Sequence, residues 1–93
     1  DSEQYAKICT ELPEDVRAIC FSFGVHRMMQ IDAKLFPEAS NLCSLAREQG
    51  FEMACYDQIV ADALRVFHPG SEEQKAFCHK LPAQWEENCL NNN

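Results

Sequence analysis

The sequence has no long apolar segment. Nowhere in its 93 residues is there a run that approaches the roughly 18 apolar residues of a membrane-spanning helix. The N-terminus also lacks a basic segment followed by an apolar one, which is the pattern of a signal peptide. We therefore expect a chain that does not span a membrane.

Positive charge is scarce. Eight Lys and Arg residues stand against 15 Asp and Glu residues, and the net charge of −7 is spread over all three thirds of the chain. Nucleic-acid binding depends on cations that neutralise phosphates, and an anionic membrane surface repels an acidic protein. We expect neither nucleic acid nor such a surface as a partner.

Catalytic and metal-binding motifs are missing as well. The three glycines stand apart, so no glycine-rich loop is available to hold phosphate. The closest cysteines are separated by 10 or 11 residues, whereas zinc-ligand pairs and redox-active pairs stand about two to four apart. Serines that would serve as nucleophiles occur in no catalytic motif: Ser22, Ser40 and Ser44. We expect no enzymatic activity and no cofactor.

One metal-binding alternative uses histidine and methionine. His26 and Met29 stand three residues apart on an expected helix, and imidazole with thioether ligands suits copper. The favoured interpretation is that Met28 and Met29 pack in the core, that His26 is partly exposed, and that the chain binds no metal.

Six cysteines dominate what the sequence does contain. A domain of this size buries too little surface for a strong core, and each disulfide adds roughly 2–4 kcal/mol. An even number of cysteines in a short chain therefore predicts three disulfides and an oxidising, extracytoplasmic location, either secreted or periplasmic. The cysteines are Cys9, Cys20, Cys43, Cys55, Cys78 and Cys89.

The spacing of these cysteines indicates a repeat. First and second members of successive pairs recur after 34 or 35 residues, and segment 9–20 aligns without gaps on segment 78–89, sharing Cys, Leu, Pro and Cys. The sequence predicts one domain of three repeats, at 1–36, 37–68 and 69–93. Large apolar residues recur at two positions of each repeat. Ile8, Leu42 and Phe77 stand before the first cysteine. Val16, Phe51 and Trp85 stand four residues before the second, a position where we expect core packing.

Each repeat is expected to be a helix, a turn and a helix. The second helices are predicted at about 14–31, a strongly apolar segment expected to be the central element, and at 51–67, with a polar side made of Asp57, Gln58, Asp62 and Arg65. Helix starts are indicated by Ser71 as an N-cap and by Pro13 and Pro82 in the first helical position. Gly50 breaks the helix of the middle repeat, and turns at 36–38 and 68–71 separate the repeats.

Local disulfides follow from this arrangement. The first cysteine lies about one turn before the loop and the second about two turns after it, so facing helices bring the two within bonding distance. Repetition favours this pairing among those open to six cysteines. The predicted pairs are Cys9–Cys20, Cys43–Cys55 and Cys78–Cys89.

The 34-to-35-residue period of helical hairpins resembles tetratricopeptide-type solenoids, and one cysteine per helix resembles their secreted cysteine-rich relatives. That resemblance implies a scaffold that binds peptides or proteins. The chain also resembles the saposins, six-cysteine helical lipid binders with nested pairs, although their terminal paired cysteines stand closer together.

The expected function is a non-catalytic, extracytoplasmic protein-interaction module or an accessory subunit of a larger assembly. Its partner is expected to be a protein with a basic surface, because the domain is acidic throughout. The alternatives are a saposin-like lipid-binding protein and a periplasmic copper helper that uses His26 and Met29.

Overall fold

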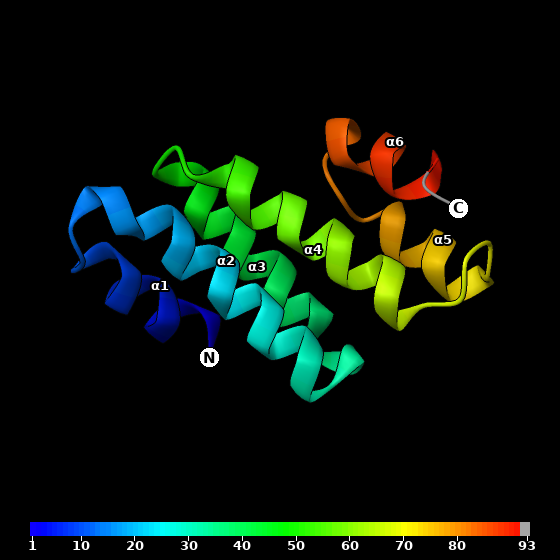
Figure 1. The fold of residues 1–93 in the computed structure, drawn as a ribbon, viewed down its shortest axis with the longest axis horizontal. Helices are drawn as coiled ribbons and strands as arrows, with labels where there is room; N and C mark the ends of the chain where they lie inside the picture. The colour runs from blue at the N-terminus through cyan, green and yellow to red at the C-terminus, as the bar shows by residue number, and fades with distance from the viewer. Residues whose placement is uncertain (92–93) are drawn as a thin grey trace.

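The structure, a computed structural model, describes residues 1–91, which fold into helices without any strand. The helices follow one another in the order α1 (Ser2–Thr10), α2 (Glu14–Ile31), the short 3₁₀ helix η1 (Ala33–Leu35), α3 (Phe36–Glu48), α4 (Glu52–Val66), α5 (Glu72–Cys78) and α6 (Ala83–Asn91) (Figure 1). This confirms the all-α prediction. None of the helices in this part of the chain is long and apolar enough to cross a membrane.

Consecutive helices pack as antiparallel pairs: α1 with α2, α3 with α4, and α5 with α6 (Figure 1). Across the first two pairs, α1 packs on α3 and α2 packs on α4, so these helices form two layers of a molecule measuring 38 × 25 × 16 Å. The prediction that the pairs are three copies of one repeat stays a prediction, and the last two residues of its third copy, 92 and 93, lie outside the described residues.

Turn chemistry explains where the helices of the middle pair end. Gly50 has φ +85°, a left-handed conformation that glycine adopts without steric cost. The Phe51 N–H donates to the Ala46 carbonyl and the Gly50 N–H donates to the Arg47 carbonyl, which is the hydrogen-bond pattern of a Schellman cap. The predicted helix break at Gly50 is confirmed. Ser71 is confirmed as an N-cap, since its Oγ accepts from the Gln74 N–H.

One predicted boundary is wrong. Residues 36–38 do not form a turn but belong to the first turn of α3, in which Pro37 occupies one of the first two positions. Proline loses no hydrogen bond there, because the first helical N–H groups have no partner inside the helix. The change of direction lies earlier, at Asp32 and η1. Pro13 and Pro82, which were expected in the first helical position, each precede their helix by one residue instead of starting it.

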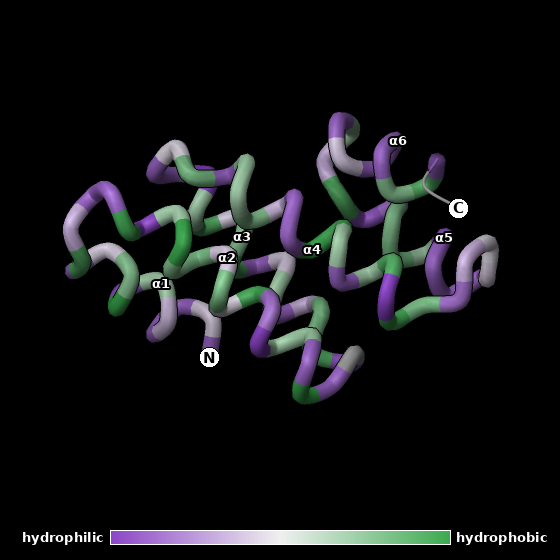
Figure 2. Tube along the Cα trace, in the orientation of Figure 1, coloured by the Kyte–Doolittle hydropathy of each residue, from purple (hydrophilic) through white to green (hydrophobic). Residues whose placement is uncertain are grey.

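Two helices, α2 and α4, share the centre of the molecule and pack closely against each other. α4 packs against α2, α3, α5 and α6, and it buries side chains on more than one face. α2 packs against α1, η1, α3 and α4, as expected of a central helix, yet Ile19 and Phe23 on its remaining face are mostly exposed. α2 carries more apolar residues than its neighbouring helices can cover, so some of these residues face outward. Figure 2 shows hydrophobic and hydrophilic residues alternating along each helix.

Gly24 allows the first three helices to approach closely. A Cβ atom at this position would lie 2.5 Å from a ring carbon of Tyr5 on α1 and 2.8 Å from Cδ2 of Leu42 on α3. Non-bonded atoms do not come so near, so only a glycine in the middle of α2 allows the side chains of Tyr5 and Leu42 to pack there together. The helix propensity lost there, about 1 kcal/mol, is the cost of that contact.

Aromatic contacts attach the third helix pair. Phe77 of α5 packs its ring against Phe36 at 4.8 Å and against Phe67 at 5.4 Å between ring centroids. Trp85 of α6 is buried as expected and lies 4.8 Å from the ring of Tyr56 on α4. Offset and edge-on ring pairs at these distances add to simple area burial. The pair α5–α6 therefore depends on the middle pair for its core.

Candidate functional site

The six cysteines join the two helices within each pair. The bonds are Cys9–Cys20, Cys43–Cys55 and Cys78–Cys89, with Cα–Cα separations of 5.6, 5.3 and 5.5 Å, and these are the three pairs that the spacing predicts. Every cysteine is fully buried except Cys20, which is half-buried. The cysteines are therefore structural cross-links, and no free thiol remains among them.

His26 and Met29, the residues of the copper alternative, are engaged elsewhere. The Nδ1 atom of His26 donates to Oδ1 of Asp62 at 2.9 Å, and Met29 of α2 is buried in the core. Within residues 1–91, no group of three or more His, Cys, Asp or Glu side chains is placed to hold a metal ion. The expectation that Met29 packs in the core and that His26 is partly exposed is confirmed.

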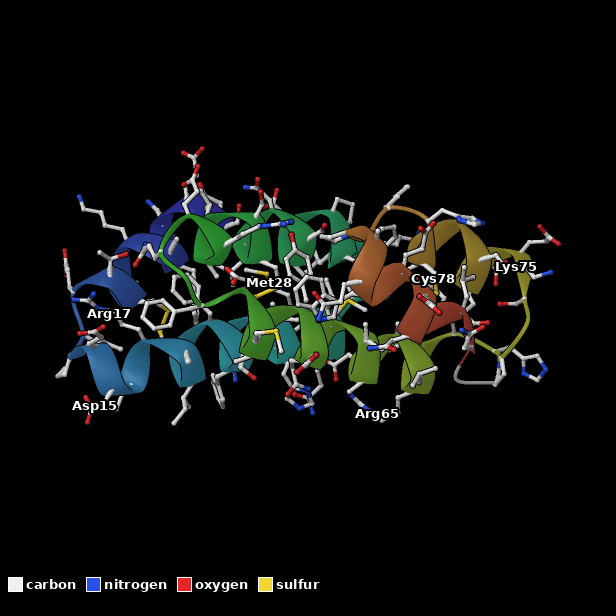
Figure 3. All side chains as sticks on the ribbon, turned by 90° about the horizontal axis from the view of Figure 1, so that it is seen from above. Asp15, Arg17, Met28, Arg65, Lys75 and Cys78 are labelled. Atoms are coloured by element: carbon white, nitrogen blue, oxygen red, sulfur yellow. A yellow bond between two sulfur atoms is a disulfide. The ribbon has the colours of Figure 1, made fainter. Side chains whose placement is uncertain are left out.

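Asp62 is the buried charge that the sequence interpretation misplaced. It was assigned to the polar side of its helix, but only 1% of its surface is exposed. Its Oδ1 accepts from His26 and from Arg65, which Figure 3 labels at the outer edge of α4, and its Oδ2 has no hydrogen-bond partner in the described part of the chain. Helix α2 covers this side of α4, which removes the carboxylate from water.

The polar contacts between α2 and α4 share one register. Ser22 donates to Gln58, and His26 donates to Asp62, so both bonds join residues 36 positions apart. A buried polar contact is favourable only with its partner in place, and a sliding of one helix along the other would separate both pairs at once. Because the Ser22 hydroxyl is directed to an amide and not to the imidazole, this cluster sets helix register and does not assemble a serine nucleophile with its base.

An apolar patch on the first helix pair is the most conspicuous surface feature. Its five members are large hydrophobic residues that remain exposed: Ile8, Leu12, Val16, Ile19 and Phe23. Ile8 and Ile19 are 57% and 67% exposed and stand beside the two cysteines of the first disulfide, whose Cα atoms are 5.6 Å apart. Val16, Ile19 and Phe23 recur at i, i+3 and i+7 of α2, so they share one face of that helix.

The counterparts of Val16 in the other pairs show what this position does when it is covered. Phe51 stacks on Phe21 of the preceding pair with 6.2 Å between ring centroids, and Trp85 packs on Tyr56 of the preceding pair at 4.8 Å. Val16 itself stays 37% exposed. The expected burial at this position is therefore wrong for the first pair, since no described segment lies against it.

Ile8 follows the same pattern. Its counterpart Leu42 packs beside Gly24 of the preceding pair, and its counterpart Phe77 packs on Phe36 of the preceding pair, and both are buried. Ile8 and Val16 of the apolar patch thus occupy the two positions that the second and third helix pairs use to contact the pair before them. Sequence reasoning placed Val16, Ile19 and Phe23 in the core; the only signal against it was that α2 carries apolar residues on more than one face.

Comparison with known proteins adds no assignment to this geometry. The chain matches no protein family, no curated protein and no solved structure. The residues and their arrangement are therefore the basis on which a function is proposed.

Proposed function

We propose that this domain is a non-catalytic, extracytoplasmic interaction module that binds a protein partner through the apolar patch. The observation that carries the proposal is the exposure of Ile8 and Val16, whose counterparts in the other two pairs are packed against a neighbouring helix pair. Contiguous exposed apolar surface on a small protein marks a contact site. The contact expected here is with an apolar helical surface of the partner.

Charge favours a basic partner over a second copy of the chain. The patch is flanked by exposed carboxylates of the segment between the first two helices and of the first turn of α2, namely Glu11, Glu14 and Asp15. Two copies, each carrying a net charge of −7, would repel one another as these carboxylates approached. A partner whose apolar contact is flanked by Lys and Arg would instead be drawn in. Three disulfides are compatible with the oxidising compartment in which such a partner is expected.

The chain offers a matched pair of substitutions for the test. Ile19 and Ile31 lie on the same helix and are 67% and 68% exposed, but only Ile19 belongs to the apolar patch. A partner recovered from the native extract under non-reducing conditions should bind Ile19→Ser on the order of tenfold more weakly than the unchanged domain. It should bind Ile31→Ser with unchanged affinity, as measured by surface plasmon resonance.

Salt separates the two contributions to binding. Raising ionic strength should slow association, because long-range attraction to the −7 charge is screened, while dissociation changes little because it depends on the apolar contact. The proposal is wrong if Ile19→Ser and Ile31→Ser weaken binding equally, if only small molecules are recovered, or if ultracentrifugation finds that the isolated domain covers the patch by dimerising.

A further inference from the structure

A cleft lined mainly by α3 carries positive charge, whereas the protein as a whole is acidic. It is a shallow concavity, open to solvent, with a volume of about 540 Å³. Its lining comes from three places, the outer face of α3, one residue of α4, and the turn between α5 and α6: Pro37, Ser40, Asn41, Ser44, Arg47, Tyr56, Lys80, Leu81 and Pro82. Two cations and no carboxylate line it, in a chain with nearly twice as many acidic as basic residues.

The helix period of α3 brings the polar part of the lining together. Ser40, Ser44 and Arg47 are spaced by four and three residues, so they follow one face of the helix. Their hydroxyl and guanidinium groups are all donors. Neither Arg47 nor Lys80 forms an ion pair with a carboxylate among residues 1–91.

Lys80 is held at the edge of the cleft by an aromatic ring. Its Nζ atom lies 5.0 Å from the centroid of the Phe36 ring, a cation–π contact that positions the ammonium group without occupying its N–H donors with a carboxylate. The adjoining Leu81 is buried, which anchors the turn that carries Lys80. The third helix pair therefore supplies one cation and α3 supplies the other.

Tyr56 contributes a neutral donor at the wall formed by α4. Burial raises the pKa of its hydroxyl, an effect that the charge of Arg47 opposes and that of Glu52 reinforces. The phenol consequently keeps its proton at physiological pH and is available as a hydrogen-bond donor. Tyr56 also stacks on Trp85, which is the only tryptophan of the chain.

From this lining we infer that the cleft binds an oxyanion, a carboxylate or phosphate group, between Arg47 and Lys80, with the hydroxyls of Ser40, Ser44 and Tyr56 as further donors. Guanidinium and ammonium groups form short charge-assisted hydrogen bonds with these anions. Because the cleft involves α3, α4 and the α5–α6 turn, it is separate from the apolar patch on α1 and α2, and its test does not depend on the proposed partner.

Tryptophan fluorescence provides the assay, because Trp85 packs on a residue of the cleft wall. The oxidised domain is titrated with inorganic phosphate, with succinate, and with a tetra-aspartate peptide, each against sodium chloride at equal ionic strength. At least one of the three probes should give a saturable change that chloride does not. The phosphate arm and the two carboxylate arms distinguish the sources of the oxyanion.

Paired substitutions locate the site. The double variant Arg47→Gln/Lys80→Gln should weaken the responding probe on the order of tenfold or more, since both charge-assisted contacts are lost. The control Arg27→Gln/Lys7→Gln removes the same charge from exposed positions outside the cleft and should leave affinity unchanged. Far-UV circular dichroism checks that both variants are folded. Equal weakening in the two variants, an unchanged Arg47→Gln/Lys80→Gln, or no saturable response to any probe would overturn the inference.

Discussion

Reduction of the three disulfides should remove most of the stability of this domain. Each bond closes a loop between residues 11 or 12 positions apart. In the chain-entropy description, closing a loop of that length raises the free energy of the unfolded state by roughly 3 kcal/mol at 25 °C. Three such loops therefore add roughly 8–9 kcal/mol to the unfolding free energy. A typical domain has a total unfolding free energy of about 5–15 kcal/mol. The reduced chain is therefore expected to be largely unfolded at 37 °C.

Urea titration followed by far-UV circular dichroism, with and without phosphine reductant, measures this loss. A variant in which all six cysteines are replaced by alanine should not respond to the reductant, which controls for effects unrelated to the bonds. Under limited reduction, Cys9–Cys20 should open first, because Cys20 is the only cysteine with an accessible side chain. A midpoint that does not move on full reduction would show that core packing alone holds the fold, and a mapped Cys9–Cys89 link would refute the pairing itself.

Two further outcomes follow from packing and burial. Gly24→Val should lower the unfolding free energy by at least about 1 kcal/mol by overpacking against Tyr5, and an unchanged urea midpoint would contradict the close approach of α1 and α2. Burial raises the pKa of Tyr56, so the folded state holds the phenol proton more tightly than the unfolded chain does. The stabilisation is complete below the unfolded pKa of about 10 and is lost as pH rises above it; urea midpoints near pH 11 should therefore fall less in Tyr56→Phe than in the unchanged protein.

Much of the local structure was predictable from the sequence. The helix break at Gly50, the cap at Ser71 and the three helix pairs depend on residues close together in the chain, whose hydrogen bonds and backbone angles have local causes. The cysteine pairs belong to the same class, because each bond spans one hairpin only. The error at Pro37 was also local: proline is compatible both with a turn and with the start of a helix, and the pattern alone does not choose between them.

The candidate sites were decided by contacts between segments far apart in the sequence. The position of Asp62 within its own helix predicts a surface carboxylate. In the fold it is buried, because His26, 36 residues away in the sequence, packs against it. The cleft joins Arg47 to Lys80 only because the α5–α6 turn packs beside α3, and no periodicity encodes that meeting. Ile8 and Leu42 occupy the same position of the sequence pattern, yet one is exposed and the other buried. Burial depends on which neighbour covers a side chain, so sequence alone determined the helices and their cross-links, while tertiary packing decided which of their surfaces remain open to a partner.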